Sequence, residues 1–196
     1  IARTLEAENF DSGLADIAVL ASQARSGEFA AALAALDEGR SVGPLVDGYF
    51  RAWATLGNGQ MSDASAAFDA LIAESGTASF ALYQKALALA LVGDFEGADE
   101  ILSGKAGGPI NATRRSVIAH AQVLSQLDRA ADAVELIDKT FGAGPSDPVI
   151  ARLRADLEAG ETVPFDLVRS PAEGIAEVFL ALGSACSDLK DAQSMM

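Results

Sequence analysis

The sequence predicts an all-α protein, a solenoid of antiparallel helix pairs. Three observations indicate this fold class. Half of the 196 residues are apolar, which is enough for a substantial core. Alanine dominates the apolar residues and aromatic residues make up only 6%, which favours closely packed helices over strands. Finally, one short motif returns at intervals close to 34 residues.

The repeated motif is a turn followed by one apolar helix face. Its turn residues, at intervals of 32, 34 and 35, are Gly27, Gly59, Gly93 and Asp128. An alanine follows each turn by five residues, at Ala32, Ala64, Ala98 and Ala133. A large apolar residue follows by nine, at Leu36, Phe68, Leu102 and Ile137. Since a spacing of four puts both on one face, we expect the alanine to let the paired helices approach and the larger residue to fill the space beside it.

Each unit ends in a helix-breaking signal. Pro44 and Pro145 follow the first and fourth turns by the same 17 residues, where proline would end one helix and start the next unit. The second unit ends near Gly76, and the third ends with Gly107, Gly108 and Pro109. The sequence therefore predicts four helix pairs, over about residues 11–44, 45–76, 77–110 and 111–145.

These residues resemble the tetratricopeptide repeat family over about residues 11–145. The family pattern has a small residue before the turn, glycine at it, an aromatic just after, then alanine and a final proline. Phe29 and Phe95 supply the aromatic, Met61 replaces it, and Asp128 and Ala130 depart from the pattern in the fourth unit. The resemblance implies a right-handed superhelix of bacterial type, with a less well packed fourth corner.

The segments before and after the four repeats depart from the repeated motif. Residues 1–10 are interpreted as the end of a preceding helix or a fragment edge, and 146–196 as a degenerate fifth unit. Its first helix is followed by Pro164 where a second helix should run, which predicts an irregular link over 160–170. Ser170 and Pro171 then predict the start of a terminal helix, either a cap or the first helix of a further repeat.

The charge balance excludes some classes of partner. The formal net charge is −14, so phosphate repulsion disfavours nucleic acid across most of the surface. The longest apolar stretches are interrupted by Lys85 and Glu177 and are shorter than the roughly 20 residues that a membrane span needs. Alanine-rich acidic repeats resemble those of bacterial proteins, some of them exported, so a periplasmic location is preferred over the cytoplasm.

Residues for catalysis are scarce, so no enzyme, cofactor or metal site is predicted. The sequence has no phosphate-binding glycine loop and no nucleophile elbow. His120 and Cys186 are the only histidine and cysteine, and they fall in different units. His120 is interpreted as a satisfied core or interface residue. The carboxylates Asp99 and Glu100 are interpreted as part of a solvated outer face.

A candidate binding surface follows from the family resemblance. In that family the first helix of each pair lines a concave groove, and the positions ten and six residues before the turn point into it. The implied groove residues are Tyr49, Trp53, Tyr83, Leu87, Ile118 and Gln122, with Arg115 at the edge. Large aromatic side chains often anchor peptides in grooves. The alternative, in which Tyr49 and Trp53 pack between neighbouring first helices, stays open.

The preferred function is a non-catalytic scaffold or adaptor that holds a peptide or helix of another protein in this groove. One alternative is a module through which a larger protein self-associates. A more remote alternative is an enzyme of helical-repeat form, which would need a cluster of titratable groups in a pocket.

Overall fold

Every regular element of the described structure is an α-helix. The computed structural model describes residues 13–74 and 76–194, with side chains as far as Gly183, and it contains no strand within these ranges. The all-α prediction is therefore confirmed. The helix end expected over residues 1–10 lies outside the described residues.

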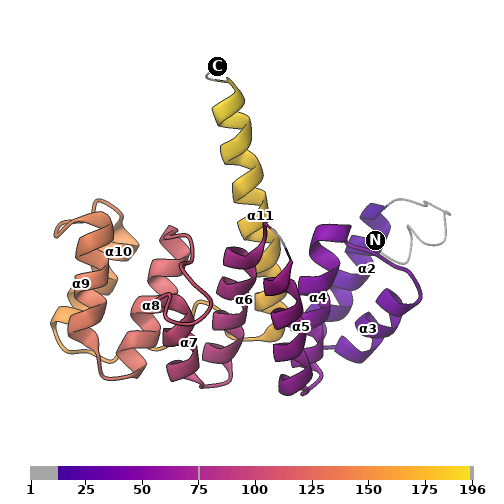
Figure 1. Cartoon of the computed structure of the whole chain (residues 1–196), viewed down its shortest axis with the longest axis horizontal. Coiled ribbons are helices and arrows are strands. Elements are labelled where there is room, and N and C mark those ends of the chain that lie inside the picture. The colour runs from indigo at the N-terminus through magenta and orange to yellow at the C-terminus, as the bar shows by residue number, and fades with distance from the viewer. Residues whose placement is uncertain (1–12, 75, 195–196) are drawn as a thin grey trace. The chain divides into compact units, whose positions relative to one another are not determined.

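The first eight described helices come two by two, each two joined by a turn of a few residues (Figure 1). The four pairs are α2 (Gly13–Arg25) with α3 (Phe29–Asp37), α4 (Pro44–Gly57) with α5 (Met61–Ala73), α6 (Ala78–Leu91) with α7 (Phe95–Leu102), and α8 (Arg114–Gln126) with α9 (Ala130–Phe141). Two further helices follow, α10 (Pro148–Glu158) and α11 (Pro171–Ser194). We call α2, α4, α6, α8 and α10 the first helices.

The chain divides into two compact units. Unit 1 comprises Ile1–Leu71 and Ser170–Met196, and unit 2 comprises Ile72–Arg169. In unit 1, α11 packs against α4 and α2 although it is far from both in sequence. In unit 2, consecutive helices from α6 to α10 pack against one another, and α8 also contacts α6 and α10.

The four turns have one and the same backbone geometry. The φ angles of Gly27, Gly59, Gly93 and Asp128 are +75°, +84°, +87° and +59°. The amide that follows each of them donates to the carbonyl five residues earlier, and these bonds are Glu28 to Gln23, Gln60 to Thr55, Asp94 to Leu89 and Arg129 to Leu124. This is the Schellman pattern of a helix that ends in a left-handed residue.

Asp128 adopts this turn without being glycine. Among the described residues it is the one non-glycine with positive φ. Aspartate tolerates the left-handed region better than most residues because its short side chain hydrogen-bonds locally. The fourth turn therefore keeps the geometry of the other three, although its sequence departs from them.

The repeated alanines lie at the most buried positions. Ala32, Ala64, Ala98 and Ala133 are all fully buried, and the larger residues four positions later are at most 8% exposed. At such positions an added methylene has no free space to occupy. The second helix of each pair thus has the packing face that the motif predicts.

The fifth unit has a first helix and a turn like those of the other units, but no second helix. Gly160 has a φ of +75°, and the amide of Glu161 donates to Asp156 as in the four earlier turns. No helix follows, because Pro164 cannot sit in a helix interior. Residues 161–169 form an irregular segment, which we call the linker. At its end, the amide of Glu173 donates to Ser170 Oγ at 3.2 Å, so Ser170 caps α11.

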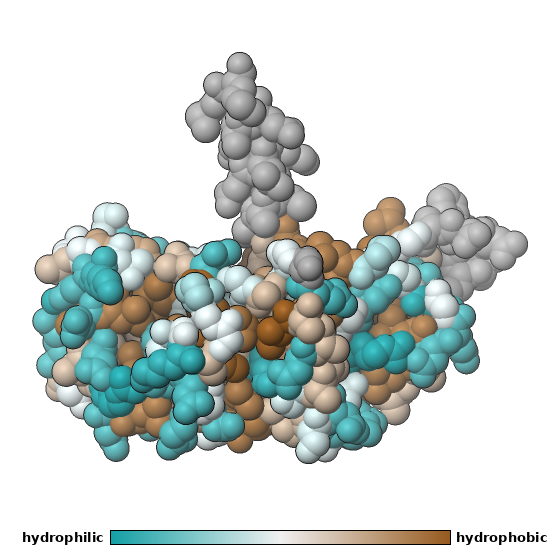
Figure 2. Space-filling model, in the orientation of Figure 1, coloured by the Kyte–Doolittle hydropathy of each residue, from teal (hydrophilic) through white to brown (hydrophobic). Residues whose placement is uncertain are grey.

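Polar residues are spread over the visible surface of both units (Figure 2). In the part of the chain that the structure describes, no helix has both the length and the apolar character required to cross a bilayer.

Candidate peptide-binding site

Helix α8 is capped at its start and packs against other helices along most of its length. A capping box starts it: Thr113 Oγ1 accepts from the Ser116 amide and Ser116 Oγ accepts from the Thr113 amide, at 3.1 and 2.8 Å. Every residue from Ser116 to Ser125 is buried. Val117, Ala121 and Leu124 join the core formed with α9 and α10. Side chains on the remaining face are therefore held in place.

That remaining face carries three polar side chains, Gln122, Ser125 and Gln126. They lie three and four residues apart, so they share one side of the helix. Gln122 and Ser125 are 6% and 3% exposed. Buried polar groups need hydrogen-bond partners, and all three find theirs in the linker.

The linker is bound chiefly through its backbone. Both backbone polar groups of Val163 are hydrogen-bonded to α8. Its amide donates to Ser125 Oγ at 2.8 Å, and its carbonyl accepts from Gln126 Nε2 at 2.7 Å. Gln122 Oε1 accepts from the amides of Asp166 and Leu167, both at 3.3 Å. Since residue 163 meets 125 and 126 while 166 and 167 meet 122, the linker runs antiparallel to α8.

Side chains of the linker add a second set of contacts. The Asp166 carboxylate accepts from Gln122 Nε2 at 2.6 Å, so both ends of the Gln122 amide are used. Val163 and Leu167 pack against the core of α8, α9 and α10, and Val168 is fully buried. The face of α8 thus binds a non-helical peptide, and that peptide belongs to the chain itself.

The expected aromatic anchors of unit 1 lie in the interior. Tyr49 and Trp53 are 1% and 0% exposed. The Trp53 ring meets Phe68 edge to face, with centroids 5.7 Å apart and planes at 82°. On α11, Gly174 lies so close to Trp53 that a Cβ there would overlap the indole ring. This face of α4 is therefore covered by α11 and does not form an open groove.

A hollow remains beside α11. It has a volume of about 320 Å³ and lies between α2 and α11, with Ala21, Ala24, Ile175 and Phe179 in its wall. Its lining is apolar, so it offers little to orient a polar ligand.

The other predicted groove residues are in unit 2, and most are buried. Tyr83, Leu87 and Ile118 are 7%, 0% and 6% exposed. Arg115 is half-buried at the start of α8. Arg154, on α10, forms ion pairs with Asp138 and Glu158 at 2.6 Å. Of the seven predicted site residues, Gln122 lies on the face of α8 that contacts the linker.

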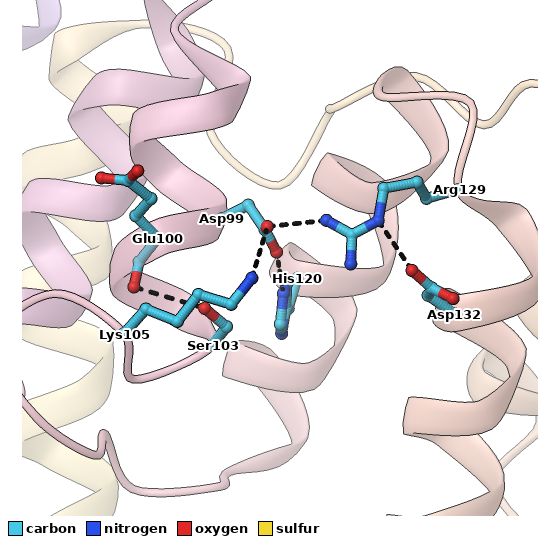
Figure 3. A network of polar contacts seen from close by, with 7 residues as sticks. All are labelled: Asp99, Glu100, Ser103, Lys105, His120, Arg129 and Asp132. Atoms are coloured by element: carbon cyan, nitrogen blue, oxygen red, sulfur yellow. Dashed lines mark hydrogen bonds and ion pairs between the residues drawn. The ribbon is translucent and has the colours of Figure 1, made fainter.

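A second polar cluster lies on the other side of α8, around Asp99 (Figure 3). Its carboxylate accepts from His120 Nε2 at 2.8 Å and from Arg129 Nη1 at 2.7 Å, and Lys105 Nζ lies 3.9 Å away. The cluster joins α7, α8 and the start of α9. The expectation that Asp99 is part of a solvated face is wrong, because it is only 6% exposed. The core role expected for His120 is confirmed.

The pKa values in this cluster follow from burial and pairing. Burial lowers the pKa of His120 below its ordinary value and outweighs the effect of Asp99, which acts to raise it. Burial alone would raise the pKa of Asp99, but hydrogen bonds from His120 and Arg129 and the charge of Arg129 bring it below its ordinary value. A neutral His120 donates from Nε2, because a carboxylate only accepts. The cluster is a structural link between helices, with each of its charges paired.

Sequence reasoning missed Ser125, Gln126 and Asp166. The available signal was the spacing of Ser125 and Gln126 from Gln122, which puts three polar residues on one face of the helix. Among the described residues, no group of histidine, cysteine and acidic side chains is placed to hold a metal ion.

Comparison with known proteins identifies no relative. No protein-family model matches the chain, and no curated protein or solved structure matches it significantly. The function is therefore inferred from the residues and their geometry.

Proposed function

We propose that this protein is a non-catalytic scaffold of the tetratricopeptide type that binds a non-helical segment of another protein on the face of its helix α8. The observation that carries the proposal is the face of α8, where Gln122, Ser125 and Gln126 hold the backbone of the linker. Side-chain amides and hydroxyls that bind a peptide backbone can accept many sequences, which is what a protein-binding surface requires.

The repeat architecture supports this proposal. Four turns share φ angles and hydrogen bonds, and four alanines share complete burial. Such regularity favours a solenoid, in which each pair stacks on its neighbours and presents a continuous surface. The net charge of −14 favours protein over nucleic acid as the partner.

Peptide display tests the proposal. Random peptides are selected on the immobilised full chain and then measured against the variant Gln122→Ala/Gln126→Ala. Selected peptides should lose about tenfold or more in affinity for the variant, since each lost hydrogen bond contributes about 0.5–1.5 kcal/mol. Peptides that bind both chains equally would show that the α8 face is not the binding site.

The matched control is Gln60→Ala, in which an exposed glutamine at the start of α5 is removed. This variant should bind the selected peptides as the parent does. A loss equal to that of the α8 variant would also contradict the proposal.

A further inference from the structure

The linker is a peptide already bound at the proposed site, so it shows which chemistry the site accepts. Val163 precedes Pro164, and the residue before a proline is restricted to extended conformations. An extended Val163 can offer its amide and its carbonyl to α8 together, at Ser125 and Gln126. Pro164 has no amide to leave unsatisfied, and it is exposed. Proline at this position therefore prepares the peptide for binding.

The second half of the linker supplies the specific contacts. The Asp166 carboxylate accepts from Gln122 Nε2, and the backbone amides of Asp166 and Leu167 donate to Gln122 Oε1. Leu167 is half-buried against the core and Val168 is fully buried. The bound segment accordingly has a carboxylate followed by two branched apolar residues, and a proline two positions before the carboxylate.

The contact that holds the Asp166 carboxylate is a hydrogen bond from a side-chain amide. The carboxylate is met by a neutral amide, so the contact depends little on long-range charge attraction. Asp166 is itself exposed at the edge of the site. A carboxylate can therefore be exchanged there without leaving a buried charge unpaired.

Resting on the proposed function, we propose that α8 binds partner segments of the form apolar-Pro-x-Asp-apolar-Val, and that the linker is the chain's own competitor for this site. The linker directly follows α10, which packs against α8 within unit 2, so its chain start is tethered close to the site. A tethered ligand of this kind acts as if present at about millimolar concentration. The apparent affinity for a partner is reduced by the fraction of closed molecules.

Fluorescence anisotropy with a labelled peptide of residues 161–169 tests the inference on the full chain. The released variant is Asp166→Ala/Val168→Ala, which weakens the linker and leaves α8 intact. It should bind the peptide about tenfold or more tightly than the parent, because the internal competitor is weakened. Adding Gln122→Ala/Gln126→Ala to it should remove this gain.

The matched control is Glu161→Ala/Thr162→Ala, which changes two exposed residues of the same linker. It should bind the peptide like the parent. A peptide in which Asp166 is replaced by alanine should bind the released variant about fivefold less tightly, as expected for one lost hydrogen bond.

The outcomes separate the two proposals. If the released variant binds display-selected peptides through Gln122 and Gln126 but gains nothing for the 161–169 peptide, the inference is overturned and the scaffold function stands. If neither chain binds any peptide through these residues, both are overturned. If circular dichroism shows that the released variant has lost helicity, Asp166→Ala alone takes its place, because Asp166 is exposed, and a gain of about fivefold is then expected.

Discussion

The two units cover the faces of their first helices in two different ways. In unit 1, α11 lies on α4 with Gly174 against the Trp53 ring, and its Ile175 and Val178 are 3% and 1% exposed. In unit 2, the linker lies on α8 through five hydrogen bonds, four of them to its backbone. Close apolar packing tolerates little substitution, whereas backbone hydrogen bonds can be made by many peptides. This difference is the basis of the proposal that the linker exchanges with a partner peptide while α11 stays in place.

The largest expected effect is in unit 1. Trp53→Ala removes a fully buried indole that contacts Phe68 and α11, so the free energy of unfolding should fall by about 3–5 kcal/mol. Urea denaturation followed by circular dichroism measures it. Leu14→Ala, at a position 73% exposed, is the control and should change stability little. A Trp53 variant as stable as this control would mean that α11 is not part of the core.

The next effect concerns the close approach of α11. Gly174→Ala puts a methyl group into the Trp53 ring, and we expect a loss of about 1–3 kcal/mol in the free energy of unfolding. Gly183→Ala is the matched control on the same helix, because a Cβ there meets nothing within 4 Å. It should be neutral or stabilise by up to about 1 kcal/mol, since alanine favours helix over glycine. Equal effects of the two substitutions would contradict the packing of α11 on α4.

A smaller effect should distinguish the two sides of α8. His120 has a lowered pKa in the folded protein, so it binds fewer protons there than in the unfolded chain. Its neutral form favours the fold, and this contribution is lost as pH falls through the unfolded value of about 6.5. Asp99 has a lowered pKa too, so its contribution is lost only at still lower pH, as pH falls through its folded pKa.

Urea denaturation at pH 8 and pH 5.5 tests this pH dependence. The parent should lose more stability over the interval than His120→Gln, which cannot titrate. The groups that face His120 are Asp99, Arg129 and Lys105. The pKa of Asp99 is lowered and that of Arg129 is raised, so neither of these two changes charge in this window. An identical pH dependence in both chains would show that His120 is not held in its neutral form.

Much of the fold is predictable from local sequence. The turns are marked by glycine at Gly27, Gly59 and Gly93, which a positive φ favours, and the buried alanines follow at a fixed spacing. Asp128 was recognised only through its spacing from Gly93. The irregular linker was foreseeable because Pro164 excludes a helix whatever surrounds it.

The covering of the first helices was not predictable in this way. Gln122 forms a hydrogen bond with Asp166, which is 44 residues away in the sequence, and Asp99 forms one with Arg129, which is 30 residues away. No local pattern specifies such pairs, because the same side chains are equally suited to solvent. The size of Trp53 marks it as an important contact residue, but nothing in the sequence indicates that it packs against Gly174, because glycine has no side chain to form a pattern.

Native-state hydrogen exchange tests most directly the claim that the linker is exchangeable and α11 is not. Amides of 161–169 should open with a free energy well below that of global unfolding and exchange faster in Gln122→Ala/Gln126→Ala, while 171–183 should exchange only near global unfolding. Added partner peptide should accelerate exchange in 161–169 alone. Equal protection of the two segments, unchanged by either treatment, would contradict the account.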